Sequence, residues 1–264
     1  MRIQHPLEGV LTLLDVDEFL RRKKGPLRWS LHDTIQDCRK LGMTVGFVTS
    51  APLQHVEHLT PVDIILAESG ALQVHNGECF VCQESSGAIN GLLTSVGLPQ
   101  SADGPWETMY GSVVIEGKRR ASLTVLCQGI LPHYSSCNAT APRKDIEAWL
   151  SGDIKRLALP LVLSVGNDDN YHWVDIINPM RNKSCSVRQL LEEIPHRHVY
   201  YGGDATSDLQ VVRENEHVIP LATRNCIEPM RVEARRRGIY VDEDGPEGGA
   251  EQVLQRIIKH HSRC

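Results

Sequence analysis

The sequence predicts an α/β protein, in which a doubly wound parallel sheet carries an inserted α+β domain. Two observations lead to this fold class. Towards both ends of the chain, short apolar runs rich in β-favouring residues alternate with amphipathic helical segments, the pattern of parallel strands joined by crossover helices. From about residue 75 to about 180 the strand-like segments are more polar and lie close together, as in antiparallel hairpins. A length of 264 residues is sufficient for both parts.

The individual elements follow from the same patterns. Short apolar runs that end at polar residues predict parallel strands at 9–17, 43–50, 62–69, 198–204, 217–222 and 238–242. Apolar stripes at helical spacing predict core helices at 30–42, 184–194, 228–238 and 249–261. In the middle region we expect hairpins over 111–129 and 161–177, with a helix over 143–157 between them. The core domain should therefore consist of residues 1–74 and 181–264, and the insert of residues 75–180.

Composition narrows the class of partner. The formal net charge is −5 and the hydrophobic content is 41%, so we expect no nucleic acid partner and no anionic membrane. No stretch approaches the roughly 18 apolar residues of a membrane span. The eight cysteines form no framework, which favours free thiols and a cytoplasmic protein. Cys79 and Cys82 form a C-x-x-C pair, but their side chains would point to opposite faces of a strand, so a zinc site is not favoured.

The chemistry-bearing residues collect where the predicted parallel strands end. In such sheets, ligands bind outside the carboxyl ends of the strands. The residues at or just beyond those ends, or before the helix that follows the insert, are Asp15, Asp17, Thr49, Ser50, Lys183, Asp204 and Asp208. Crowded carboxylates repel one another unless a cation lies among them, and ligands that are all oxygen favour a hard ion such as Mg²⁺.

This residue set suits phosphoryl transfer. A carboxylate beside the ion can attack phosphorus and form an aspartyl-phosphate, a role that we predict for Asp15. Asp17, two residues further along, would protonate the leaving oxygen and later act as base. Thr49 and Lys183 would hold the phosphoryl oxygens, and Ser50 would contact the substrate. These roles would explain why two carboxylates follow the apolar run in "LTLLDVDEFL" (11–20).

Four motifs, in order, carry a family resemblance: "LLDVDEFL", "FVTS", "NKSCSVRQLL" and "YYGGDATSDLQVV". Together they resemble the motifs of the haloacid dehalogenase (HAD) superfamily of phosphatases, and the resemblance covers nearly the whole chain. The insert resembles the large α+β cap, called C2, of sucrose-phosphate, trehalose-phosphate and mannosyl-3-phosphoglycerate phosphatases and of phosphomannomutase. The resemblance implies a Rossmann-like core and a cap that determines specificity.

Residue roles follow from the resemblance position by position. It implies that Mg²⁺ is held by Asp15, the backbone carbonyl of Asp17 and Asp204, with Asp208 near the ion. The stretch "IEGKRRASLTV" is similar to a sugar-contacting segment of trehalose-phosphate phosphatases, which makes Glu116 and Lys118 candidate substrate contacts. The chain departs from the family pattern at Glu18 and Phe19, where the family has Gly-Thr, and at Ala51, where it often has Arg.

The expected function is therefore a Mg²⁺-dependent phosphoric monoester hydrolase acting on a small phosphate ester, with a sugar phosphate favoured. The protein would be a monomer or homodimer. A phosphomutase of the same fold stays open, as does a non-catalytic phospho-ligand binder, which Glu18 and Phe19 suggest. A phosphorelay receiver also uses an acidic pocket and a lysine, but such receivers are short and lack an insert of this size.

Overall fold

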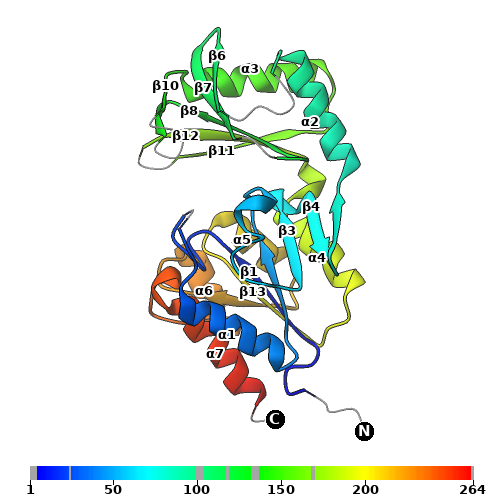
Figure 1. The fold of residues 1–264 in the computed structure, drawn as a ribbon, viewed down its shortest axis with the longest axis vertical. Helices are drawn as coiled ribbons and strands as arrows, with labels where there is room; N and C mark the ends of the chain where they lie inside the picture. Colours follow the sequence, from blue (N-terminus) through cyan, green and yellow to red (C-terminus); the bar gives the residue numbers. More distant parts are fainter. Residues whose placement is uncertain are drawn as a thin grey trace. The chain divides into compact units, whose positions relative to one another are not determined.

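A computed structural model describes residues 5–23, 25–98, 104–116, 119–131, 137–167 and 170–262. The chain forms two compact units, which are described separately (Figure 1). The core unit comprises Met1–Cys79 and Lys183–Cys264, and the insert unit comprises Phe80–Asn182. Within the described ranges, no helix combines the length and the apolar character that crossing a membrane requires.

The core unit is built on an eight-stranded sheet with the order β15-β14-β13-β1-β2-β3-β4-β5. Its strands are β1 (Val10–Asp15), β2 (Thr44–Val48), β3 (Ile64–Ala67), β4 (Leu72–His75), β5 (Glu78–Val81), β13 (His198–Gly202), β14 (Val218–Ala222) and β15 (Ile239–Tyr240). The six strands from β15 to β3 are parallel, whereas β4 runs antiparallel to β3. All six residues of β1 are buried, as expected for a central strand that is covered on both faces.

Strand register determines which side chains meet at the carboxyl edge of the sheet. Asp15 lies opposite Val48 of β2, and Leu14 lies opposite Gly202 of β13. Thr49 and Gly203 therefore leave their strands at the same edge as Asp15. Asp15 and the residues that follow β2 and β13 therefore share one edge of the sheet.

Five α-helices cover the sheet: α1 (Trp29–Lys40), α4 (Lys183–Glu193), α5 (Thr206–Glu214), α6 (Glu228–Arg237) and α7 (Gly249–His261). The connection through α1 leads from β1 towards β2, and the connection through α5 leads from β13 in the opposite direction, towards β14. Because both crossovers between parallel strands are right-handed by rule, they place α1 and α5 on opposite faces. Helix α1 packs against α7, and α4 packs against α5 (Figure 1).

The insert unit contains a five-stranded antiparallel sheet with the order β11-β12-β8-β7-β6. These strands are β6 (Gly104–Thr108), β7 (Gly111–Glu116), β8 (Leu123–Cys127), β11 (Val162–Asn167) and β12 (His172–Ile177), and β9 (Gly129–Leu131) pairs with β10 (Cys137–Ala139). Two helices, α2 (Gln83–Ser95) and α3 (Arg143–Arg156), share an apolar core with one face of the sheet. Alternate residues of β7, Val113 and Ile115, enter that core, so Val114 and Glu116 face the other side.

The structure confirms the predicted fold class, the six parallel strands and both hairpins. Helix α2 was not predicted, because its sequence "QESSGAINGLLTS" contains two glycines and three serines, which are poor helix formers. It forms because Ile89, Leu92 and Leu93 are buried in the core of the insert. The boundary between the units lies after Cys79 rather than after residue 74, since β4 and β5 extend the core sheet.

Candidate active site

Three carboxylates converge at the carboxyl edge of the core sheet. Asp15 ends β1, Asp204 follows β13, and Asp208 lies in the first turn of α5. One carboxylate oxygen from each residue lies within 4.8 Å of the corresponding oxygens of the other two. Asp15 and Asp208 are buried, and Asp204 is partly exposed. Residues nearly 200 positions apart in the chain thus form one acidic cluster.

Among the described residues, Lys183 contributes positive charge to this cluster. Lys183, the first residue of α4, donates hydrogen bonds to Oδ1 of Asp15 at 2.6 Å and to Oδ1 of Asp208 at 2.8 Å. Burial lowers the pKa of Lys183, but attraction to Asp15 and Asp208 outweighs burial, so the pKa is raised. The lysine is therefore protonated at neutral pH and partly neutralises the carboxylates.

Lys183 does not fully offset the cost of ionising the clustered carboxyl groups. Burial raises the pKa of Asp15 well above its usual value; Lys183 opposes this effect, and Asp208 and Asp204 add to it. Burial and the neighbouring Asp208 raise the pKa of Asp204 to about 6, although Lys183 lowers it. A further cation among these oxygens would favour the ionised carboxylates.

Asp208 is the most constrained member of the cluster and is fully buried. Its Oδ1 also accepts a hydrogen bond from the hydroxyl of Tyr201 at 2.7 Å, and its Oδ2 accepts one from the backbone N–H of Ala205 at 3.0 Å. The contact with Ala205 satisfies a backbone donor at the start of α5. Asp208 consequently orients Lys183 and anchors its own helix. Tyr201 was not predicted as a site residue, because in the sequence it has the pattern of a buried strand residue.

The two glycines before Asp204 are required by close contacts. A methyl group added to Gly203 would lie 2.3 Å from Cγ of Asp208, so only glycine leaves room for that carboxylate. A methyl group on Gly202 would lie 2.5 Å from the ring of Phe19. Phe19 is fully buried and fills the space that Gly202 leaves beside β13. The unusual Phe19 is therefore part of the core packing beneath the site.

Asp17 lies outside the cluster of three carboxylates. Its Oδ1 accepts a hydrogen bond from Nε of Arg21 at 3.0 Å, and its side chain remains 27% exposed, so solvent and ligands can reach it. The next residue, Glu18, has a φ of 66°, in the left-handed region that glycine adopts most easily. The backbone at Glu18 thus takes a conformation that suits the glycine usual in the resembled family.

Thr49 and Ser50 differ in accessibility. Thr49 is buried, and its hydroxyl accepts a hydrogen bond from the backbone N–H of Ala51 at 3.0 Å. Ser50 is exposed, and its Oγ accepts a hydrogen bond from the hydroxyl of Ser69 at 3.0 Å. Ser69 belongs to a short turn, Glu68–Gly70, in which all three residues have positive φ. This strained turn braces the segment after β2.

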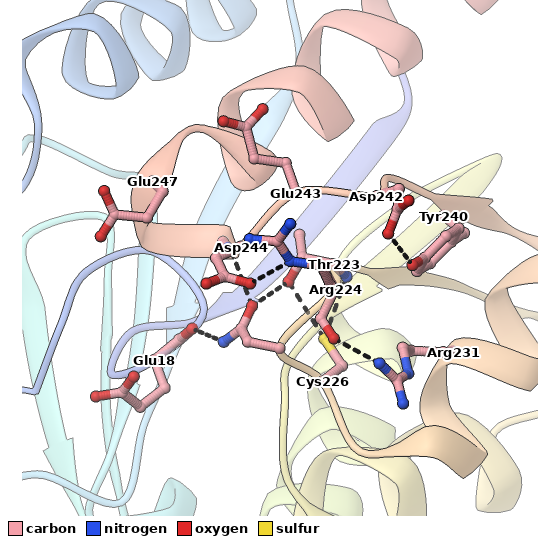
Figure 2. A network of polar contacts seen from close by, with 12 residues as sticks. Glu18, Thr223, Arg224, Cys226, Arg231, Tyr240, Asp242, Glu243, Asp244 and Glu247 are labelled. Carbon is pink, nitrogen blue, oxygen red and sulfur yellow. Dashed lines mark hydrogen bonds and ion pairs between the residues drawn. The ribbon is translucent and has the colours of Figure 1, made fainter.

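A second loop supports the site from the side of β14 (Figure 2). Asn225 donates from Nδ2 to the carbonyl of Glu18 at 2.6 Å, and its Oδ1 accepts hydrogen bonds from the hydroxyl of Thr223 and the N–H of Gly245. Cys226 donates from Sγ to the carbonyl of Gly203 at 3.3 Å. The loop therefore ties together the residues that follow β1 and β13.

The predicted substrate contacts in the insert have a different setting. Glu116 is buried and forms a salt bridge with Arg119, whose Nη1 also donates to the hydroxyl of Ser122 at 3.0 Å. Lys118 lies outside the described residues. The contribution of Glu116 and Lys118 to substrate binding stays a prediction.

The cluster fits the divalent cation that the sequence analysis predicted. Its donors are all carboxylate oxygens, which suit Mg²⁺. Three carboxylates face a single lysine, so the charge of the site favours a further cation. The residues that would hold the ion are Asp15, Asp204 and Asp208, and the backbone carbonyl of Asp17 stays a predicted fourth donor.

Searches with the sequence find no matching family model and no matching curated protein. Solved structures do match. A trehalose-6-phosphate phosphatase related protein superposes with a TM-score of 0.68 at 14% identity, over 96% of this chain and 99% of that one. The sucrose-phosphatase of Synechocystis sp. PCC6803, solved with sucrose and phosphate, gives 0.60 at 11% identity, over 97% and 98%. A haloacid dehalogenase-like hydrolase of Bacteroides thetaiotaomicron gives 0.61 at 14%, over 94% and 98%.

The chain has the haloacid dehalogenase fold. Coverage is nearly complete in both directions, so the likeness extends over the core and the insert alike. At identities of 11–14% the superposition establishes the fold, and the residues of the site indicate the chemistry. The structure brings together Asp15, Asp204, Asp208 and Lys183, which were predicted from their place at strand and helix ends, whereas their roles stay predictions. Sequence reasoning missed Arg21, Tyr201 and Asn225, whose partners are distant in sequence or lie within a turn.

Proposed function

We propose that the protein is a Mg²⁺-dependent phosphatase of a small phosphorylated metabolite, most simply a sugar phosphate. The observation that carries this proposal is the buried arrangement of Asp15, Lys183 and Asp208 beside Asp204 in the HAD fold. The names of two structural neighbours, which refer to phosphates of trehalose and sucrose, support a sugar phosphate.

The proposed reaction uses the chain's own groups in two steps. A carboxylate oxygen of Asp15 attacks phosphorus, the bond from phosphorus to the ester oxygen breaks, and Asp17 gives its proton to the departing alcohol. Water then attacks the aspartyl-phosphate, Asp17 takes a proton from that water, and inorganic phosphate leaves with Asp15 restored. When bound, Mg²⁺ would neutralise charge on the phosphoryl group.

Electrostatics of the site support these roles. Lys183 opposes the rise in the pKa of Asp15, and a bound cation would oppose it further, which would favour the ionised carboxylate as a nucleophile. Asp17 is 27% exposed and pairs with Arg21, so its carboxyl group is accessible to a leaving oxygen. Thr49 and Lys183 would contact the phosphoryl oxygens, and the insert unit would determine specificity.

The test is release of inorganic phosphate from a panel of sugar phosphates, with Mg²⁺ and with EDTA. We expect turnover only with Mg²⁺, and Asp15→Asn should lower it by about 10⁴-fold or more, because the nucleophile is lost. Asp33→Asn, an exposed carboxylate on α1, serves as the matched control and should retain activity. Isomerisation without phosphate release would indicate a phosphomutase, and binding without turnover would indicate a non-catalytic receptor.

A further inference from the structure

A pocket of about 610 Å³ lies in the core unit beside the proposed general acid. Its lining includes Arg21, Leu27, Trp29, His32, His58 and Leu59. These residues come from the segment after β1, the start of α1 and the segment after β2. Since β1 and β2 are parallel neighbours, both segments leave the edge of the sheet that carries the acidic cluster. The volume is in the range of small-molecule sites.

Arg21 connects this pocket with Asp17. The residue is only 4% exposed, its Nε donates to Asp17, and its Nη1 donates to the carbonyl of Gly25 at 3.1 Å. Its third nitrogen, Nη2, is buried and has no acceptor in the described part of the chain. A buried charged donor without an acceptor is unfavourable. A ligand oxygen that displaces the side chains covering Nη2 would relieve this cost.

Trp29 supplies an apolar surface at the same pocket. Its side chain is 81% exposed, although tryptophan is usually among the more buried residues of a folded protein. The ring of His32 meets the indole edge-on, with the ring centroids 5.8 Å apart. The exposed indole is therefore braced by a neighbour rather than buried in the core.

His58 adds a hydrogen-bond acceptor. Its Nδ1 lies 3.2 Å from the carbonyl of Gln54, and because a carbonyl oxygen only accepts, Nδ1 carries the hydrogen. When the ring is neutral, Nε2 is then an acceptor. Together with the donor on Arg21 and the apolar face of Trp29, this gives the pocket three distinct recognition elements.

We propose that this pocket binds the sugar ring of the leaving group. A pyranose has an apolar C–H face that can lie on the Trp29 indole, and its hydroxyls both donate and accept hydrogen bonds, which matches His58 and Arg21. The proposal rests on the proposed function, and it assigns part of the substrate recognition to the core unit rather than to the insert.

Binding can be measured without turnover. The chain has four tryptophans, of which only Trp29 lies in the core unit, while Trp106, Trp149 and Trp173 lie in the insert unit. Their indole N–H signals can be followed by two-dimensional NMR, with the Trp29 signal identified by its loss in Trp29→Phe. We expect glucose, trehalose or sucrose 6-phosphate, added to Asp15→Asn, to shift the Trp29 signal. If all three shift only the insert signals, or no signal, the proposal is wrong.

Kinetics separate this proposal from the proposed function. Trp29→Ala should raise KM for a sugar phosphate about tenfold, the scale on which a hydrophobic pocket contact discriminates substrates. The KM for acetyl phosphate should not change, because the acetate leaving group has no sugar ring. Val232→Ala, which removes an exposed apolar side chain from α6, should change neither. Equal effects of Trp29→Ala on both substrates, or none, would overturn the pocket assignment.

Failure of the wild-type protein to hydrolyse any substrate would instead overturn the phosphatase proposal. The NMR titration would still show whether the pocket binds the sugar phosphate.

Discussion

Two buried charged clusters, one in each unit, differ in how their charges are balanced. At the core edge three carboxylates, Asp15, Asp204 and Asp208, share one lysine. In the insert, Glu116 is paired with Arg119, and Asp175 accepts a hydrogen bond from the hydroxyl of Thr124. A buried charge is stable only when it is compensated. In the insert, Arg119 and Thr124 offset much of the negative charge, whereas the three core carboxylates outnumber Lys183, which favours binding of an external cation.

The largest expected effect comes from removing the cationic residue of each cluster. Lys183→Met and Arg119→Met should each lower the free energy of unfolding by about 3–5 kcal/mol, the usual cost of breaking a buried pair. Mg²⁺ should restore part of the loss in Lys183→Met, because it supplies charge to the same carboxylates, and none in Arg119→Met. Urea unfolding of each variant in EDTA and in Mg²⁺ measures the loss of stability and its recovery by the ion. Equal recovery of stability by Lys183→Met and Arg119→Met in Mg²⁺ would contradict a cation preference confined to the core cluster.

Glycines in the two units should respond in opposite directions. Gly203→Ala places a methyl group against the Asp208 carboxylate and should cost about 2–3 kcal/mol, with loss of phosphate release. Gly87→Ala, within helix α2 of the insert, meets no atom within 4 Å and should stabilise the protein by about 0.5–1 kcal/mol through helix propensity. Thermal and urea unfolding of both variants provide the check. A neutral Gly203→Ala would show that Asp208 need not lie where it does.

Neighbouring tyrosines of β13 allow a finer test of the acidic cluster. Tyr201→Phe removes a donor to Asp208 and should cost about 1.5–3 kcal/mol, the range for a hydrogen bond to a charged group. Because Asp208 is then less well oriented, the Mg²⁺ concentration for half-maximal activity should rise several-fold. Tyr200→Phe, whose hydroxyl contacts His261 instead, should leave the Mg²⁺ requirement unchanged. An equal shift in both variants would point to a general effect on the strand.

The smallest expected effect is on pH dependence without metal. Because the pKa of Asp204 is raised to about 6 in the folded protein, the folded state binds a proton more tightly than the unfolded state does. The contribution of Asp204 to stability is therefore present below about pH 4 and is lost as the pH rises through about 6. In EDTA we expect the melting temperature to fall by about 2–4 °C over this window relative to Asp204→Asn, which corresponds to about 1 kcal/mol after allowance for solvent screening. Mg²⁺ should abolish the difference, and an unchanged difference would contradict the compensation argument.

Much of the core could be predicted because its signals are local. The run 11–14 followed by Asp15 is typical of a buried parallel strand and its end, and parallel strands present their carboxyl ends at one edge. The sequence therefore predicted that Asp15 and Asp204, each at the end of a parallel strand, lie at the same edge of the sheet. Helix α2 was not, because its stability comes from packing of Ile89 and Leu92 rather than from propensity.

The amino-acid sequence by itself determined the alternation of strands and helices and the place of the insert. It also determined that the carboxylates and the lysine lie at strand and helix ends. These features depend on hydrophobic periodicity and chain order. Tertiary structure alone decided the side-chain partnerships: Tyr201 with Asp208, Phe19 against Gly202, and Arg21 between Asp17 and the pocket at Trp29. These contacts depend on exact side-chain positions within folded turns or across segments that meet only in the folded chain. No local pattern of residues encodes such positions.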